Sequence, residues 1–375
     1  MGLEDVEDWY GGSYDVTPAG PTPPAAKVEG AQAFSVAEWA PLVALVPRGK
    51  TPGDALVLGR FLPVHRGHAR LLAAAVGHVA GRVHVGVSAR SGDLLTPAMR
   101  ARTLFALLPP AAQGSVAHAQ DLGRQGEPDG DDFWQPWLAW LGQQPSLKRC
   151  RVLVSGTPSA RRFAELAGLE FHLVDRSEVP VSGTAIRADP WKHWDDIAPL
   201  LRQHYTRAVA LVGPEGAGKS TLGEALRVHY GTRLATEYTP RYLATFGLQR
   251  PRREDFAELE RGVLDGWDAA RQGARKLFFL DTELLQLWLW ERRLFGDVTE
   301  RRLVAPALTL LLDDAPWLGP PERDEPEARR AFVAELRREL EQRGWPYVFI
   351  SGPREARLEQ AIRAVDRLRY AGWSG

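Results

Sequence analysis

From Ala55 onward, short apolar runs alternate with longer stretches in which apolar residues recur at helical spacing. The runs expected to form strands lie at 55–61, 82–89, 151–156 and 171–176, and the helical patterns between them lie at 67–79, 96–109 and 159–169. Runs that are apolar throughout are typical of strands buried on both faces. Their alternation with helices predicts a parallel α/β sheet.

The same alternation starts again near residue 206. This second series predicts a helix at 219–230 and strands at 207–213, 275–281, 307–313 and 347–351. A further helix is expected at 191–205, between the two series. The pattern therefore predicts two consecutive α/β domains with parallel sheets, at 51–205 and 206–375, and we find no internal repeat.

Residues 1–50 have a different texture, with Gly, Pro and small residues and no periodicity over about the first 30. We expect a mostly disordered extension with one short helix at 34–46. Two helices and a turn do not fit there, so no helix-turn-helix DNA reader is expected.

Composition narrows the class of protein. The 375 residues carry 47 Lys and Arg against 47 Asp and Glu, so a global electrostatic grip on nucleic acid is not expected. There is no apolar run of about 18 residues to span a membrane, and the acidic start is not a secretory signal. The single cysteine, Cys150, allows no internal disulfide, and its apolar neighbours indicate a core residue. We expect a cytoplasmic protein with small-molecule partners. A homo-oligomer is compatible with the sequence.

The second domain contains "GPEGAGKST" at 213–221, which fits G-x-x-x-x-G-K-[ST] between a strand and a helix. Such a loop turns backbone N–H groups toward the phosphates of ATP, a Lys reaches the β- and γ-phosphates, and a Ser hydroxyl can bind Mg²⁺. The residues predicted to bind ATP are Gly213, Gly216, Gly218, Lys219, Ser220 and Thr221.

Other groups of this domain are candidates for phosphoryl transfer. Asp281, at the end of a predicted buried strand, is expected to hold Mg²⁺ or activate the acceptor, with Asp313 as its rival and helix capping as the alternative role. In "TEYTPRYL", Glu237 is a candidate base for a substrate hydroxyl and Arg241 a candidate phosphate ligand, against plain surface charge.

The kind of P-loop protein is narrowed by what accompanies the loop. No guanine-reading N-K-x-D motif is present, which favours a kinase over a GTPase switch. Arg323, Arg329 and Arg330 lie where small-molecule kinases carry a lid, although a solvated helix start fits them equally well.

The first domain contains "GRFLPVHRGH" at 59–68, between a strand and a helix, where α/β sheets bind ligands. His65 and His68 are expected to donate hydrogen bonds to phosphate near a helix N-terminus, and Gly59 and Gly67 to allow close approach. Buried structural histidines and a zinc pair are the alternatives, and a zinc pair lacks a third ligand with suitable spacing.

"VSGTAIRADP" at 181–190 is expected to complete this site. Ser182, Thr184 and Arg187 offer two hydroxyls and a guanidinium, and if Thr184 caps the helix, the N–H groups of the helix start and Arg187 can face phosphate. A plain capped helix is the alternative.

These two motifs, G-x-F-x-P-x-H-x-G-H and S-x-T-x-I-R, are similar to the signature of the nucleotidyltransferase superfamily. With a P-loop kinase behind them, the chain from about 55 to 351 resembles the bifunctional nicotinamide mononucleotide (NMN) adenylyltransferase/ribosylnicotinamide kinase family, the NadR type. The resemblance implies a Rossmann-like nucleotidyltransferase domain followed by a P-loop kinase domain.

The resemblance also implies the chemistry. The kinase domain would phosphorylate nicotinamide riboside to NMN with ATP and Mg²⁺, and the first domain would adenylylate NMN with ATP to NAD and pyrophosphate. His65, His68, Arg187, Lys219, Glu237 and Asp281 would be catalytic. Arg60 and Phe61 would join the nucleotide-binding residues.

A tryptophan-bearing segment of the family implies that Trp137, between Trp134 and Trp140 in "DDFWQPWLAW", stacks on the nicotinamide ring, whereas a helical Trp stripe is more often core. The family's N-terminal DNA-binding motif is not evident here, and "LGPPERDEP" departs from the family pattern at the kinase lid.

Three other functions compete with this one. The first is a riboside kinase with an inactive, nucleotide-sensing transferase domain. The second is a transferase of the same superfamily with another substrate, such as phosphopantetheine or a cytidylyl acceptor. The third is a nucleotide-responsive regulator acting through the first 50 residues.

Overall fold

The structure is a computed structural model that describes residues 39, 43, 46–120, 131–175, 177, 179–301, 303–313 and 326–368. These residues divide into two compact units, and the chain passes from one to the other between Tyr205 and Thr206. The N-terminal extension and the helix expected at 34–46 lie almost entirely outside the described residues. Within the described ranges, no helix has the length and apolar character needed to cross a membrane.

The first unit is built on a parallel sheet of five strands in the order β3-β2-β1-β4-β5. The strands are β1 (Asp54–Gly59), β2 (Val83–Ala89), β3 (Gln113–Gln120), β4 (Cys150–Ser155) and β5 (Glu170–Leu173). The parallel α/β architecture predicted from the apolar runs is confirmed. Strand β3 was not expected, because "QGSVAHAQ" has too few large apolar residues to stand out.

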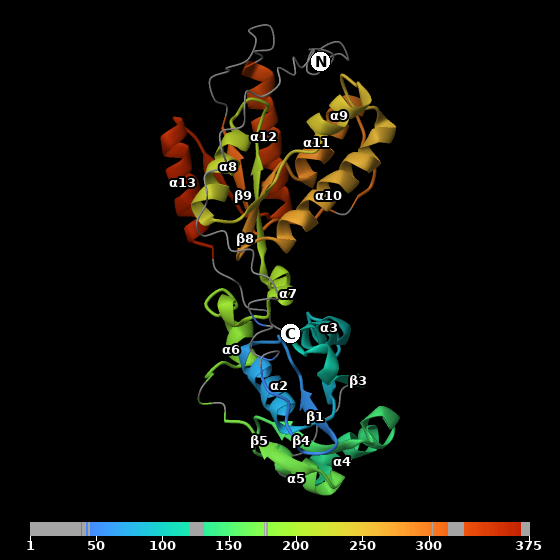
Figure 1. The fold of residues 1–375 in the computed structure, drawn as a ribbon. Helices are drawn as coiled ribbons and strands as arrows, with labels where there is room; N and C mark the ends of the chain where they lie inside the picture. Colours follow the sequence, from blue (N-terminus) through green and yellow to red (C-terminus); the bar gives the residue numbers. More distant parts are fainter. Residues whose placement is uncertain are drawn as a thin grey trace. The chain divides into compact units, whose positions relative to one another are not determined.

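Helices cover both faces of this sheet (Figure 1). They are α2 (Arg66–His78), α3 (Pro97–Leu107), α4 (Asp131–Gly142), α5 (Ala160–Ala167) and the short α6 (Gly183–Ala188). Ala55 and Val57 point into a core with α2 and α3, whereas Leu56 points into a core with α4 and α5. Successive strand residues face opposite sides, so an uninterrupted apolar run satisfies both layers.

The prediction of a single helix at 191–205 is wrong. The segment forms a 3-10 helix at Trp194–Asp196, the one-turn helix α7 (Pro199–Arg202) and another 3-10 helix at Gln203–Tyr205. Pro199 explains the break, because a residue before proline is pushed out of the helical region, and Ala198 has ψ 131°.

The second unit is also a parallel five-stranded sheet, in the order β10-β9-β6-β8-β7. Its strands are β6 (Arg207–Val212), β7 (Arg233–Ala235), β8 (Leu277–Asp281), β9 (Leu308–Leu312) and β10 (Tyr347–Ile350). Its helices are α8 (Lys219–Tyr230), α9 (Thr239–Phe246), α10 (Phe256–Gln272), α11 (Leu284–Phe295), α12 (Pro326–Arg343) and α13 (Arg354–Asp366).

Helices α10, α11 and α12 share one core with Ala210 and Val212 of β6 and Phe278 and Leu280 of β8. Helices α8 and α13 pack against each other, as Figure 1 shows. All five strands run the same way, so the loops after β6, β7, β8, β9 and β10 meet at one edge of the sheet.

Candidate active sites

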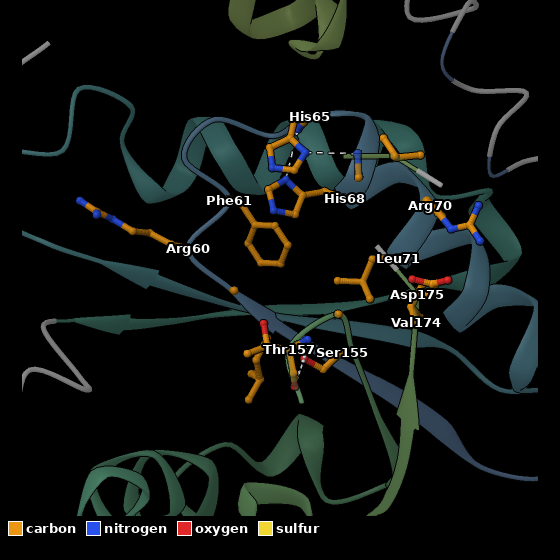
Figure 2. Close-up of a pocket in the computed structure, with 15 residues that line it drawn as sticks. Arg60, Phe61, His65, His68, Arg70, Leu71, Ser155, Thr157, Val174 and Asp175 are labelled. Carbon is orange, nitrogen blue, oxygen red and sulfur yellow. Dashed lines mark hydrogen bonds between the residues drawn. The ribbon is translucent and has the colours of Figure 1, made fainter. Parts of the chain in front are cut away.

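The first candidate site lies where β1 and β4 end side by side. The chain leaves β1 for β2 on one side and later returns to β4 on the other, and such a reversal opens a crevice at the carboxyl edge of a parallel sheet. A cavity of about 190 Å³ occupies this position (Figure 2). Its lining residues are Leu58, Gly59, Arg60, Phe61, His65, Gly67, His68, Arg70, Leu71, Ser155, Gly156, Thr157, Val174, Asp175 and Val179.

Both predicted histidines line this cavity, and Figure 2 shows their rings stacked above Phe61. His65 is the N-cap of α2, where its Nδ1 accepts a hydrogen bond from Gly67 N–H at 3.2 Å. Nδ1 of His68 accepts one from His65 N–H at 3.2 Å, and the two ring centres are 3.7 Å apart.

Because each Nδ1 accepts a hydrogen bond, the neutral imidazoles carry their proton on Nε2. This tautomer supplies two N–H donors at the start of α2, as phosphate binding requires. Among the described residues no group of three His, Cys, Asp or Glu could hold a metal ion, which leaves the zinc alternative without support.

The glycines of this loop are required by close contacts. A Cβ at Gly67 would lie 3.0 Å from Cε1 of His65, and one at Gly59 would lie 3.0 Å from the Phe61 ring. Phe61 has φ 52°, so the loop turns sharply just after β1. The glycines therefore let the histidine and phenylalanine rings pack over the end of the strand.

The second predicted motif meets the first although the two are far apart in sequence. Arg187 on α6 donates to the carbonyl of Leu62 at 2.6 Å, across a separation of 125 residues. Its other Nη donates to Oγ1 of Thr184 at 3.2 Å. Burial lowers the pKa of the Arg187 guanidinium, and the nearby Arg60 lowers it further. The structure thus brings Arg60 and Arg187 together beside the histidine loop.

The N-cap of helix α6 is Ser182 and not Thr184, the residue considered for this position from the sequence. Ser182 is the N-cap of α6, and its Oγ accepts from Ala185 N–H at 3.1 Å. Thr184 lies inside the helix. An N-cap side chain bonds the N–H two or three residues on, and in this helix Ser182 occupies that position.

Several residues of this site were missed by sequence reasoning. Ser155 and Thr157 line the floor of the cavity, and Oγ of Ser155 accepts from Thr157 N–H at 3.1 Å. "SGT" directly after an apolar strand was the available signal. Arg100 and Asp93 lie behind Arg60 and carried no motif; Arg100 donates to the Arg60 carbonyl at 2.5 Å.

Trp137 is not among the residues that line this cavity. Trp134, Trp137 and Trp140 are about nine-tenths buried on α4, in the core that includes Leu56 and Phe163. The structure therefore places the tryptophan stripe in the packing layer between α4, α5 and the sheet.

The second candidate site is the loop between β6 and α8. Gly213, Gly216 and Gly218 have φ values of 155°, 71° and 84°, a region that favours glycine. Nζ of Lys219 donates to the carbonyls of Gly213 and Pro214 at 3.1 and 3.0 Å, so the side chain curls over the loop. Ser220 and Thr221 are exposed in the first turn of α8. The predicted phosphate-binding loop thus has the backbone shape that its sequence requires.

Acidic groups gather beside this loop. Asp281 ends β8, pairs in register with Leu211 of β6 and is 3% exposed. Its Oδ1 has no hydrogen-bond partner among the described residues. Glu237 follows β7; burial raises the pKa of its carboxyl, Lys219 opposes this and Asp281 adds to it. Lys219, Glu237 and Asp281 are therefore within electrostatic reach of one another.

Asp313, the rival of Asp281, directly follows β9 on the other side of β6. Its backbone N–H donates to the Ile350 carbonyl at 2.8 Å. Asp281 is among the charged groups that raise the pKa of Glu237, which places Asp281 close to the other candidate groups.

The predicted arginines are spread out. Arg241 is exposed on α9, with its guanidinium over the Tyr238 ring at 5.4 Å. Arg329 is buried on α12, Arg330 is exposed, and Arg323 lies outside the described residues. The lid expected at Arg323, Arg329 and Arg330 therefore stays a prediction.

Beside the phosphate loop is a hollow of about 470 Å³ that sequence reasoning missed. Residues 216–218, 221, 222 and 225 form one wall, and the loop and helix start at 352–358 form the other. Arg357 joins the walls, donating to the carbonyls of Ala217 at 2.9 Å and Gly352 at 2.6 Å. "SGP" after the last apolar run was the available signal for this loop.

Comparisons with known proteins cover both units. A family model described as an AAA domain matches residues 208–357, which contain the phosphate loop and Asp281. Two proteins, from Salmonella typhimurium and Escherichia coli, each described as "Trifunctional NAD biosynthesis/regulator protein NadR", are 28% identical over 254 and 255 residues. The chain is similar to NadR proteins. This confirms the resemblance predicted from the motifs.

The match to these NadR proteins covers 61% of this chain and 60% of each relative's length. Two solved structures agree in fold: NadR in complex with NR has a TM-score of 0.66, and NadR in complex with NAD and AMP-PNP has 0.63. They cover 87% and 88% of this chain and 99% of their own chains, both at 20% identity. The likeness of fold extends over nearly all of both structures.

Proposed function

We propose that the protein converts nicotinamide riboside to NAD in two steps that each consume ATP. The second unit would phosphorylate the riboside to NMN, and the first would join NMN to the adenylyl group of ATP. The observation that carries this proposal is the pairing of the histidine loop with Arg187 in one unit, in a chain whose other unit holds a phosphate loop. The NadR relatives are described as NAD biosynthesis proteins, and the solved NadR structures hold NR, NAD and AMP-PNP.

The first unit has what adenylyl transfer needs. A phosphate oxygen of NMN attacks the α-phosphorus of ATP, the α–β bond breaks, and pyrophosphate leaves. No protein nucleophile is needed, so catalysis consists of positioning and charge stabilisation. The Nε2–H groups of His65 and His68 and the guanidiniums of Arg60 and Arg187 would bind the phosphates at the start of α2.

The second unit has what phosphoryl transfer to a hydroxyl needs. Glu237 would accept the proton of the riboside hydroxyl as its oxygen attacks the γ-phosphorus of ATP, and ADP leaves. Lys219 would exchange the carbonyls of its own loop for phosphate oxygens. The hollow beside the loop would hold the adenine base, between residues 216–225 and 352–358.

The same unit fits Mg²⁺. Oδ1 of Asp281 is buried without a hydrogen-bond partner among the described residues, and the Ser220 hydroxyl is exposed beside the loop. Carboxylate and hydroxyl oxygens are ligands that Mg²⁺ accepts. Ser220 and Asp281 would hold the ion, which supplies charge compensation for the phosphates.

A chromatographic time course tests the proposal. Purified protein is incubated with nicotinamide riboside, ATP and Mg²⁺, and NMN and NAD are followed. Appearance of NMN and then NAD is the expected result. Accumulation of NMN without NAD would mean that the first unit uses another substrate or only senses nucleotide. If neither product forms, the proposal fails for the second unit, and the same assay started from added NMN decides the first.

A further inference from the structure

Arg60, which is among the residues that line the first cavity, is held by a buried pair of residues that the catalytic chemistry above does not use. The pair is Arg100 on α3 and Asp93 in the loop between β2 and α3. Arg100 is 0% exposed, and Asp93 has a side chain 4% exposed. Neither residue lines the cavity.

The contacts of this pair converge on Arg60 from two sides. Nη1 of Arg100 donates to the Arg60 carbonyl at 2.5 Å and to the Ser88 carbonyl at 3.0 Å. Oδ1 of Asp93 accepts from Nη2 of Arg60 at 2.5 Å, and Oδ2 faces Nη2 of Arg100 at 3.2 Å. Backbone and guanidinium of Arg60 are thus both fixed, each by a different member of the pair.

Burying a guanidinium completely carries a large desolvation cost, which a well-packed apolar residue at the same place would avoid. Burial accordingly lowers the pKa of Arg100, and Asp93 works against this shift. An apolar side chain at position 100 would avoid this cost, but it could not donate a hydrogen bond to the Arg60 carbonyl. The buried charge of Arg100 therefore indicates that the position of the Arg60 backbone matters for the neighbouring cavity.

Asp93 also reduces the electrostatic repulsion among three neighbouring arginines. Arg60, Arg100 and Arg187 lie close enough that Arg60 affects the pKa of both others. Without Asp93 these cations would repel one another, and Arg60, whose side chain is 32% exposed, would be free to turn to solvent. With Asp93, the Arg60 guanidinium is held in place within electrostatic reach of Arg187 before any phosphate arrives.

We propose that Asp93 and Arg100 are positioning residues that set Arg60 in place to bind the phosphates of ATP, and the pyrophosphate that leaves, in the first unit. This rests on the proposed adenylyl transfer. Binding groups fixed in advance do not have to be ordered when the ligand arrives, so the loss of either should weaken phosphate binding more than it slows the chemical step.

The test uses the reverse reaction, in which NAD and pyrophosphate give NMN and ATP, because pyrophosphate alone reports on the phosphate subsite. Wild type, Asp93→Asn, Arg60→Ala and the double variant are compared in the full chain. We expect Asp93→Asn to raise KM for pyrophosphate about tenfold with a smaller change in kcat, as befits one lost charge-assisted hydrogen bond. In the Arg60→Ala background the same change should have no further effect.

Two controls separate positioning from general damage. Asp131→Asn removes another Asp–Arg pair of the same unit, with Arg162 at 2.5 Å, that is half exposed and does not line the cavity; KM should stay at the wild-type value. Riboside phosphorylation by the second unit normalises for the amount of chain, and urea unfolding of the first unit reports whether that unit is folded in each variant. Asp93→Glu keeps the charge, should restore part of the affinity, and replaces Asp93→Asn if that variant does not fold.

Two results would overturn the proposed positioning role of Asp93. An unchanged or lower KM in Asp93→Asn overturns the inference, and so does a penalty that multiplies with that of Arg60→Ala. A wild-type protein that forms neither NAD nor, in reverse, NMN means that the proposed function itself has failed.

Discussion

At the residue scale, Gly183 lies where the first site has little room for a side chain. A Cβ there would lie 2.6 Å from the Leu62 carbonyl oxygen and 3.3 Å from Nη1 of Arg187, so it would push apart the two motifs that this hydrogen bond joins. We expect Gly183→Ala to lower adenylyl transfer about 100-fold, since small misplacements of binding groups have effects of that size. Initial rates of NAD formation from NMN and ATP measure it.

The matched control for this change is Gly142→Ala in the same unit. A Cβ at Gly142, the last residue of α4, meets nothing within 4 Å. Alanine there should leave transfer unchanged. Equal losses in the two variants would show that the effect of Gly183→Ala does not come from its contact with Leu62.

A second residue-scale prediction concerns the stability of the second unit. Glu283, the N-cap of α11, is fully buried, and burial raises the pKa of its carboxyl to about 7 although Leu285 N–H donates to it. Between pH 4.5 and about 7, the Glu283 carboxyl is therefore protonated in the folded state and ionised in the unfolded state, whose pKa is 4.5. Its contribution to stability is complete below pH 4.5 and is lost as the pH rises to about 7.

Glu283→Gln keeps an oxygen for the cap and removes the titration. We compare the unfolding free energy of the variant with that of wild type at two pH values. The difference should shift in favour of the variant by about 3 kcal/mol between pH 4.5 and pH 8, because each unit of pKa shift corresponds to about 1.4 kcal/mol. Urea unfolding of the second unit at both pH values measures this difference. A gap between variant and wild type that does not change with pH would contradict it.

At the scale of the elements, hydrogen bonds of Asp54 join strands β1 and β2 of the first sheet at the edge opposite the candidate adenylyl-transfer site. Asp54, at the start of β1, accepts from Arg82 N–H at 2.8 Å and faces Nε2 of His84 on β2 at 3.1 Å. Burial acts to raise the pKa of Asp54, but these hydrogen bonds outweigh it and the pKa is lowered. The stabilisation is therefore present above the usual carboxyl pKa and is lost as the pH falls through the lowered one.

Asp54→Asn should destabilise the first unit by about 1–3 kcal/mol at neutral pH, the cost of impairing a buried charged hydrogen-bond group. NAD formation per folded molecule should not change, because the strand ends that bear the site lie at the other edge. The exposed pair of Asp131 and Arg162 serves as the comparison, because solvent screens it and Asp131→Asn should cost much less stability than Asp54→Asn. Equal losses of stability from the two changes would remove any special role for Asp54.

The elements also show how far sequence reasoning reaches. The apolar strands were predicted within two or three residues, and for β2, β8 and β9 the reason is that burial on both faces leaves an unbroken run. Strands β3 and β7 were not, since a short or small-residue strand is defined by its neighbours in the sheet. The phosphate loop and the two histidines were found because local geometry fixes residue types at fixed spacing.

The remainder of the site depends on contacts distant in sequence. Arg100 reaches back 40 residues to the Arg60 carbonyl, and Arg357 reaches back 140 residues to that of Ala217. No sequence spacing predicts a buried arginine whose hydrogen-bond partner is a main-chain carbonyl oxygen. The same holds for the tryptophans of α4, where sequence shows a stripe but only the fold shows which side the stripe faces.

At the scale of the whole molecule, each cavity is lined, among the described residues, by one unit alone. Each step should then survive the loss of the other. Lys219→Ala should lower riboside phosphorylation at least about 100-fold, as loss of a group that binds transition-state charge does, and leave NAD formation from NMN intact. His68→Ala should do the reverse.

Mixing these two variants gives the sharpest test of how the steps are joined. Neither alone should make NAD from nicotinamide riboside, but together they should, because NMN released by the second unit of one molecule can reach the first unit of another. NAD should appear after a lag that shortens with protein concentration, since the intermediate must build up in solution. If the mixture makes no NAD although Lys219→Ala uses added NMN and His68→Ala phosphorylates riboside for a single turnover, NMN is not released from the chain that makes it, and two sites working independently would not describe the molecule.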